Sequence, residues 1–198
     1  MSKSDPASSK KERNKTIRWV VSIFFITILI SAIISYASDE IMDRSTITVA
    51  FLILLGIVLL GIVFDIIGVA VTSADEKPFH SMAARKVPGG IEAIRLLRNA
   101  ERVSSICNDV VGDICGVVSG AAAATISAQV FAAMEGTPTL EDVVPLVMSA
   151  LVAGLTVGGK AIGKTFAINS CTTIVSGVGR IIYFMSHISE LFKRKNTK

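Results

Sequence analysis

The sequence predicts an all-α membrane protein with about four transmembrane helices and cytoplasmic juxtamembrane amphipathic helices. The chain has 198 residues, 51% of them hydrophobic, and a mean hydropathy of +0.62. Runs without any charged residue cover 19–38, 45–64, 114–134 and 143–159. Each run is close to the ~20 residues with which a helix crosses a bilayer. Continuously apolar runs favour helices over a β-barrel, whose strands alternate apolar and polar residues.

The distribution of charge predicts how the spans are oriented. Lys and Arg concentrate in residues 1–18, 77–102 and 180–198, whereas the connections 39–44 and 135–142 are acidic and contain Arg44 as their only basic residue. Because cytoplasmic loops are enriched in Lys and Arg, we expect both termini and the central segment to be cytoplasmic in a multi-pass protein of the plasma (inner) membrane. Because the positive charge lies in the segments that flank the spans, the net charge of +4 does not indicate nucleic acid, and we expect the lipid bilayer as partner.

The N-terminal part divides into an arm and a helix. Residues 1–15 are polar and lysine-rich, and we expect a disordered basic cytoplasmic arm. Residues 16–38 predict an extra N-terminal transmembrane helix that faces lipid, with the helix itself over Thr16–Ala37. A cleaved signal sequence is the alternative, but the apolar run exceeds the usual ~7–15 residues and no small-residue cleavage site follows it.

The middle of the chain predicts a long helix followed by two short ones. The second span is expected over Thr46–Thr72. Residues 73–102 then read as two amphipathic helices, because Pro88-Gly89-Gly90 interrupts the pattern. The second of them has an apolar side opposite Arg95, Arg98 and Arg102, so we expect it to lie along the membrane surface.

Glycine spacing distinguishes the third and fourth spans. Small residues four positions apart allow helix backbones to approach closely, which is how helices associate within lipid. These two spans therefore predict the packed core of a bundle or a homodimer. The glycines assigned to helix packing are Gly116, Gly120, Gly154, Gly158, Gly159 and Gly163.

The C-terminal part carries apolar residues at helical spacing from Thr172 onward, followed by a basic cytoplasmic tail over 186–198. We expect a juxtamembrane amphipathic helix at the inner leaflet. A fifth span is the alternative, although Arg180 interrupts it and the final basic residues would then lie outside the cytoplasm.

Five charged residues lie within or at the ends of the apolar runs, namely Asp65, Asp109, Asp113, Lys160 and Lys164. Each costs roughly 3 kcal/mol in mid-membrane, so we expect it to pair, face water or bind a ligand. Asp109 and Asp113 are four residues apart, on one helix face, and Asn108 precedes them. Carboxylate and amide oxygens suit Mg²⁺ or Ca²⁺. Lys160 and Lys164 share the same spacing, so a structural network of ion pairs or a proton relay stays open.

The sequence does not predict an enzyme. It contains no nucleophile–base constellation, phosphate-binding loop or metalloprotease motif. The three cysteines, Cys107, Cys115 and Cys171, have no metal-ligand spacing and are interpreted as small packing residues.

Three stretches resemble motifs of the CNNM/CorC (cyclin-M-like) transmembrane domain. Residues 64–73, FDIIGVAVTS, resemble its F-S-G-A-E-T-A-L-T-S signature. Residues 107–112, CNDVVG, resemble its G-N-x-x-x-N motif, and residues 159–164, GKAIGK, resemble its G-E-x-x-P-K motif. The order and separation of the motifs are also similar, and the resemblance covers residues 46–185.

The resemblance implies a homodimeric transporter that binds or moves Mg²⁺, in a minimal form without the cytoplasmic CBS-pair regulatory domains. By position it assigns ligands to Asp65, where the family has serine, to the matching Asn108 and to the backbone of Gly112, with Asp109 and Asp113 nearby. Lys160 stands where the family has glutamate. This motivates the alternative, a non-transporting membrane interaction or regulatory protein in which the lysines pair with the aspartates and a separate regulatory protein is recruited.

Overall fold

The computed structural model describes residues 6–43, 45–134 and 138–195, and all regular structure within these ranges is helical. By length and composition, four helical segments could cross a membrane. This confirms the predicted fold class. The segments are Ile17–Met42, Ile47–Ser73, Ala100–Ala133 and Val143–Asn169.

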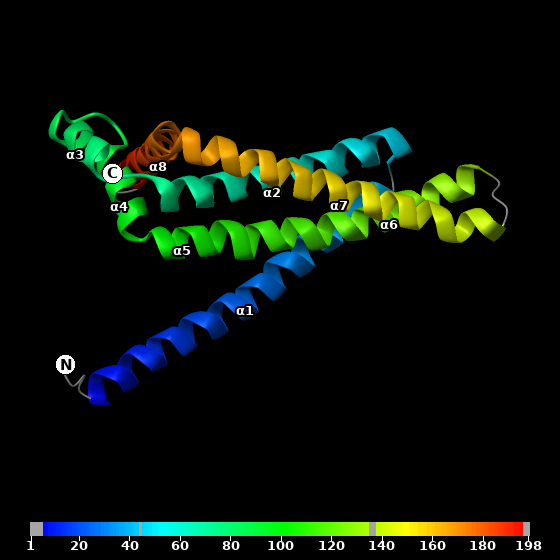
Figure 1. Cartoon of the computed structure of the whole chain (residues 1–198), viewed down its shortest axis with the longest axis horizontal. Coiled ribbons are helices and arrows are strands. Elements are labelled where there is room, and N and C mark those ends of the chain that lie inside the picture. The colour runs from blue at the N-terminus through cyan, green and yellow to red at the C-terminus, as the bar shows by residue number, and fades with distance from the viewer. Residues whose placement is uncertain (1–5, 44, 135–137, 196–198) are drawn as a thin grey trace.

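The long helices run lengthwise through the molecule (Figure 1). α2 (Ile47–Ser73), α6 (Asp113–Ala133) and α7 (Pro138–Asn169) contact one another and form a three-helix bundle. α1 (Pro6–Asp43) packs against α6 over its second half and diverges from the bundle toward its first residues (Figure 1). The bundle therefore contains the second to fourth spans, with the first span on its outside.

α1 begins at Pro6, earlier than the expected start near Thr16. Residues 6–15, expected to be disordered, continue the helix, and residues 1–5 lie outside the described ranges. Proline is favoured in a first helical turn, and no glycine or further proline interrupts the lysine- and glutamate-containing stretch that follows. Phe24, Phe25 and Leu29 are about 60% exposed, as a lipid-facing helix requires.

Short helices gather at one end of the bundle. α3 (Lys77–Ala84) and α4 (Gly90–Arg98) are separated at Pro88-Gly89, as the sequence predicts. α5 (Ala100–Ser105) and the π-helix η1 (Ile106–Gly112) lead into α6. α8 (Cys171–Lys195) is seen nearly end-on in Figure 1, so it crosses the bundle axis. Within the described ranges, α8 is not among the helices apolar enough to be a span, so the alternative of a fifth span gains no support.

Apolar clusters fix the bundle at both ends. At the end with the short helices, one cluster joins α2, α3, α4, α7 and α8, and its most deeply buried large residue is Phe79. Toward the opposite end, Met42, Leu54 and Ile126 belong to a cluster that joins α1, α2 and α6. A third group, around Val110 and Val118, joins α1 to η1 and α6. α2 contributes residues to all of these clusters, so one face of it lies at the centre of the bundle.

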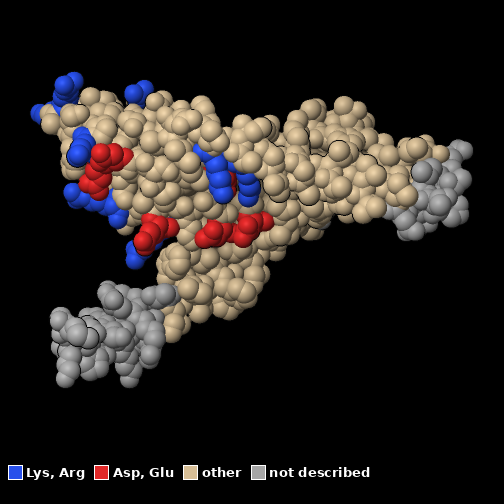
Figure 2. Space-filling model, in the orientation of Figure 1, with Lys and Arg blue, Asp and Glu red and all other residues tan. Residues whose placement is uncertain are grey.

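The first residues of α1, the short helices and α8 lie at the same end of the molecule (Figure 1). The last residues of α1 and α6 and the first residues of α2 and α7 lie toward the other end (Figure 1). Figure 2 shows charged side chains concentrated at the end with α3 and α4, and a smaller group of both signs further along the body. The two ends of the described chain therefore lie at the same end of the bundle, which is the arrangement that the charge pattern predicts.

Candidate functional site

Asp65 is a carboxylate enclosed by the packing of α2 and α7. Its residue is 6% exposed. Gly163 of α7 lies against Ile66, and a Cβ on Gly163 would come within 2.8 Å of an Ile66 carbon. Gly159 contacts Ile62 in the same way, one helical turn earlier. Because Asp65 lies between Ile62 and Ile66 on this packed stretch, the two glycines bring α7 close around the carboxylate.

Lys160 of α7 supplies the positive charge beside this carboxylate. Its Nζ lies 3.9 Å from Asp65 Oδ1, and its side chain is 28% exposed. The same Nζ would lie 3.5 Å from a Cβ placed on Gly112. The ammonium therefore occupies the point where α2, α7 and the end of η1 meet. A distance of 3.9 Å is an ion pair without a hydrogen bond, since N–H···O bonds span about 2.7–3.2 Å.

Two oxygens of this region are buried and have no hydrogen-bond partner among the described residues, Asp65 Oδ2 and Asn108 Oδ1. Buried polar atoms in folded proteins are nearly always hydrogen-bonded or in contact with water or an ion. A carboxylate oxygen and an amide carbonyl oxygen are both acceptors, so each can accept a hydrogen bond from water or coordinate a cation.

The π-helix η1 determines where Asn108 lies. Its wider turn rotates residues 106–112 relative to an α-helix, and such turns are frequent at functional sites. Asn108 Nδ2 donates to Ser104 Oγ at 3.3 Å, and this bond leaves Oδ1 directed at α2. A Cβ on Gly68 would overlap Asn108 Oδ1. Gly68 follows Asp65 by three residues on α2, so the Asn108 carbonyl lies against the adjoining helical turn.

The remaining predicted charges do not join this buried pair. Asp109 and Asp113 are exposed, and Asp109 Oδ2 accepts a hydrogen bond from Ser105 Oγ at 2.8 Å. Lys164 is exposed as well. In the described part of the chain, no group of three His, Cys, Asp or Glu side chains could hold a metal ion.

The packing glycines fall into two groups. Gly159 and Gly163 are at the α2–α7 contact, and Gly112 is beside Lys160. In contrast, a Cβ added to Gly116, Gly120, Gly154 or Gly158 would meet nothing within 4 Å. The second group lines open surface of α6 and α7 in the single chain.

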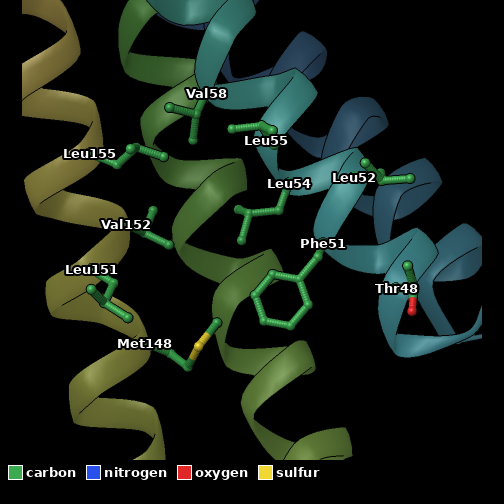
Figure 3. A pocket seen from close by; sticks show the side chains of 10 residues that line it. All are labelled: Thr48, Phe51, Leu52, Leu54, Leu55, Val58, Met148, Leu151, Val152 and Leu155. Carbon is green, nitrogen blue, oxygen red and sulfur yellow. The ribbon is translucent and has the colours of Figure 1, made fainter.

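An apolar groove lies between α2 and α7, around Leu54 (Figure 3). Its volume is about 390 Å³. Thr48 is the only polar residue of its lining, which otherwise consists of Phe51, Leu52, Leu54, Leu55, Val58, Met148, Leu151, Val152 and Leu155. With no charged group on its walls, the groove is suited to apolar contacts and lies apart from Asp65.

Sequence reasoning identified Asp65, Asn108 and Lys160 but missed Gly68 and Ser104, which position Asn108. The π-helix was also missed, because its residues have no spacing that separates them from an α-helix. The one available signal was Gly68 itself, since a glycine in the interior of an apolar helix often marks a close approach.

Comparison with protein families, with curated proteins and with solved structures found no match for this chain.

Proposed function

We propose that the protein moves a small inorganic cation across the membrane, Mg²⁺ first, through a site formed by Asp65 and Asn108. The observation that carries the proposal is the pair of buried, unpartnered oxygens, Asp65 Oδ2 and Asn108 Oδ1, on adjoining helices. Hard oxygen ligands are the ones that Mg²⁺ prefers. The resemblance of residues 46–185 to the CNNM/CorC transmembrane domain supports the same function and adds a homodimer.

Lys160 has a defined part in this proposal. Its ammonium neutralises Asp65 while no ion is bound, so the membrane interior holds no uncompensated charge. A divalent cation that reaches Asp65 must displace the ammonium. The Nζ–Oδ1 separation of 3.9 Å favours this exchange, because no short hydrogen bond between the two groups has to be broken first.

The orientation that fits the charge pattern places both termini and α3 to α5 in the cytoplasm. Asp65 then lies in the cytoplasmic half of α2, about two helical turns from the end of that helix at Ser73. An ion bound there would reach the cytoplasm over a short path, and alternating access would open the longer path between α2 and α7.

A second candidate is favoured by one observation, the Asp65–Lys160 contact itself. If this pair is purely structural, the protein is a non-transporting membrane protein that acts through a partner. The two candidates differ in what happens when the charges are exchanged, because an ion pair tolerates reversal whereas a cation site loses its carboxylate.

The test is Mg²⁺ flux into liposomes that contain the purified protein and an entrapped fluorescent Mg²⁺ indicator. We expect Asp65→Asn and Asn108→Ala each to reduce the flux at least tenfold. Asp75→Asn is the matched control, because Asp75 is exposed and follows α2. Flux that is unchanged in both site variants contradicts the proposal. Absence of flux in the wild type, together with a wild-type unfolding temperature in the exchanged variant, Asp65→Lys with Lys160→Asp, supports the structural pair instead.

A further inference from the structure

Two hollows adjoin at Asn99, where α4 ends and α5 begins. The first is polar, about 590 Å³ in volume, and is lined by residues 97–102, which include Arg98 and Arg102. The second is mainly apolar, about 270 Å³ in volume, and is lined by Leu96, Val103 and Ile182 together with Glu92, Arg95 and Asn99. Neither contains a residue of the Asp65 site.

The position of the hollows relative to the spans is distinctive. The third candidate span begins at Ala100, which lines the polar hollow. Val103, on the wall of the apolar hollow, lies within the first turn of that span. This helical segment has 34 residues, about 51 Å at ~1.5 Å per residue, which exceeds the ~30 Å hydrocarbon core, and its charge-free run begins only at Ile114. Its first residues therefore lie at the level of the lipid headgroups, where arginines can bind phosphates.

The apolar hollow continues into an exposed apolar surface of α8. One side of α8 is buried through Val175 and Gly179, and Gly179 packs against α4. On the other side, Ile181, Phe184 and Met185 are more than half exposed. Ile182 adjoins them and lines the apolar hollow. An amphipathic helix that exposes this much apolar surface across the end of a membrane bundle is covered by lipid.

The charge of the junction complements a single negative charge. Arg95, Arg98 and Arg102 line the two hollows together with Glu92 and Glu101, which leaves one excess positive charge. The wider connection, residues 74–105, also carries more Lys and Arg than Asp and Glu. Guanidinium groups bind phosphate oxygens with paired hydrogen bonds. A phosphodiester with one negative charge matches this balance.

We propose that the α4–α5–α8 junction binds one anionic phospholipid. Its phosphodiester lies between Arg98 and Arg102, and one acyl chain lies along Leu96, Val103 and Ile182. The inference is independent of the cation site, since it uses no residue of that site and requires no transport.

The test uses the full-length protein in nanodiscs of phosphatidylcholine with a minor fraction of phosphatidylglycerol, followed by native mass spectrometry of the lipid that stays bound. We expect one phosphatidylglycerol per chain in the wild type. Arg98→Gln with Arg102→Gln should weaken retention about 25-fold, because each Lys or Arg at an anionic surface contributes roughly a factor of five. Arg85→Gln with Lys86→Gln is the matched control and should retain the lipid.

Two further variants keep the test decisive. Arg98→Lys with Arg102→Lys preserves charge and should retain most of the lipid, even if the glutamine pair impairs folding. Ile182→Ser changes only the apolar hollow and should also weaken retention. Equal retention in the glutamine pair and its control would overturn the proposal. Release of the lipid by millimolar inorganic phosphate would also overturn it, because the site would then recognise free phosphate and not a lipid.

Discussion

At Asp65 a carboxylate is almost wholly enclosed by apolar side chains, and the ammonium beside it is 3.9 Å away. Such a group is costly in a membrane unless it is paired or faces water. Glycines bring the neighbouring helices close enough to supply its polar neighbours. Gly68 admits the amide of Asn108, and Gly159 and Gly163 admit Ile62 and Ile66. The properties of the site therefore depend on positions that have no side chain.

The first prediction concerns Gly68→Ala. The new Cβ would overlap Asn108 Oδ1, so η1 must shift away from α2. We expect the free energy of unfolding to fall by about 1–3 kcal/mol, the usual cost of overpacking a core. Gly56→Ala is the control on the same helix, because nothing lies within 4 Å of its added Cβ. It should leave stability unchanged or raise it by about 0.5–1 kcal/mol. Thermal unfolding in detergent measures both variants, and equal transitions would refute the close contact.

The second prediction concerns Lys160→Met. Removal of the ammonium leaves Asp65 as an unpaired buried carboxylate, and we expect a loss of about 3 kcal/mol of stability. Adding Asp65→Asn should recover most of it, because the charge is then gone. If Asp65 is a cation ligand, millimolar Mg²⁺ should raise the unfolding temperature of Lys160→Met more than that of the wild type. A response to Mg²⁺ that is the same in Lys160→Met and in the double variant would exclude Asp65 as the ligand.

Among the elements, the turn before α4 makes a close backbone contact with α8. Gly89 has a φ of 88°, in the left-handed region, and its added Cβ would lie within 2.5–2.7 Å of the backbone of Gly179 and Arg180. The turn that begins α4 therefore requires glycine for both its conformation and its packing. Through this contact the connection between the second and third spans is attached to the helix that follows the fourth.

The third prediction follows from this contact. Gly89→Ala should separate α4 from α8 and cost about 2–4 kcal/mol, through backbone strain and overlap together. Gly177→Ala is the control on α8, because its added Cβ meets nothing within 4 Å. Limited proteolysis of the 74–105 connection measures the separation. Equal cleavage rates in the two variants would contradict it.

How far the sequence predicts an element depends on what determines its ends. The second span was expected over Thr46–Thr72 and is observed over Ile47–Ser73, since Asp65 is the only charged residue before Asp75 in this apolar stretch. The break at Pro88-Gly89 was predictable for the same kind of reason, namely a local conformational signal. The π-helix at Ile106–Gly112 was not, because nothing in its residue spacing separates it from an α-helix. The Asp65–Lys160 contact was likewise only one of several pairings that the spacing allowed.

For the whole molecule, the single chain leaves a surface of small residues without a partner. Gly116 and Gly120 on α6 and Gly154 and Gly158 on α7 face open space, whereas the other packing glycines are in contact within the chain. Stripes of small residues in spans are the usual surface for helix association in lipid. The proposed homodimer gives this surface an occupant.

The fourth prediction is that Gly116→Leu with Gly120→Leu yields a folded monomer. No atom within 4 Å opposes the new Cβ atoms, so the bundle of one chain should keep its unfolding temperature, while close approach of a second α6 is blocked. Light scattering of the detergent-solubilised protein and cross-linking in membranes measure the oligomeric state. Gly56→Leu, on open surface of α2, controls for added bulk and should leave the dimer intact. If the leucine pair and the wild type have the same mass, α6 is not the dimer interface. If the leucine pair instead unfolds, Gly116 and Gly120 pack within the chain and do not face open space.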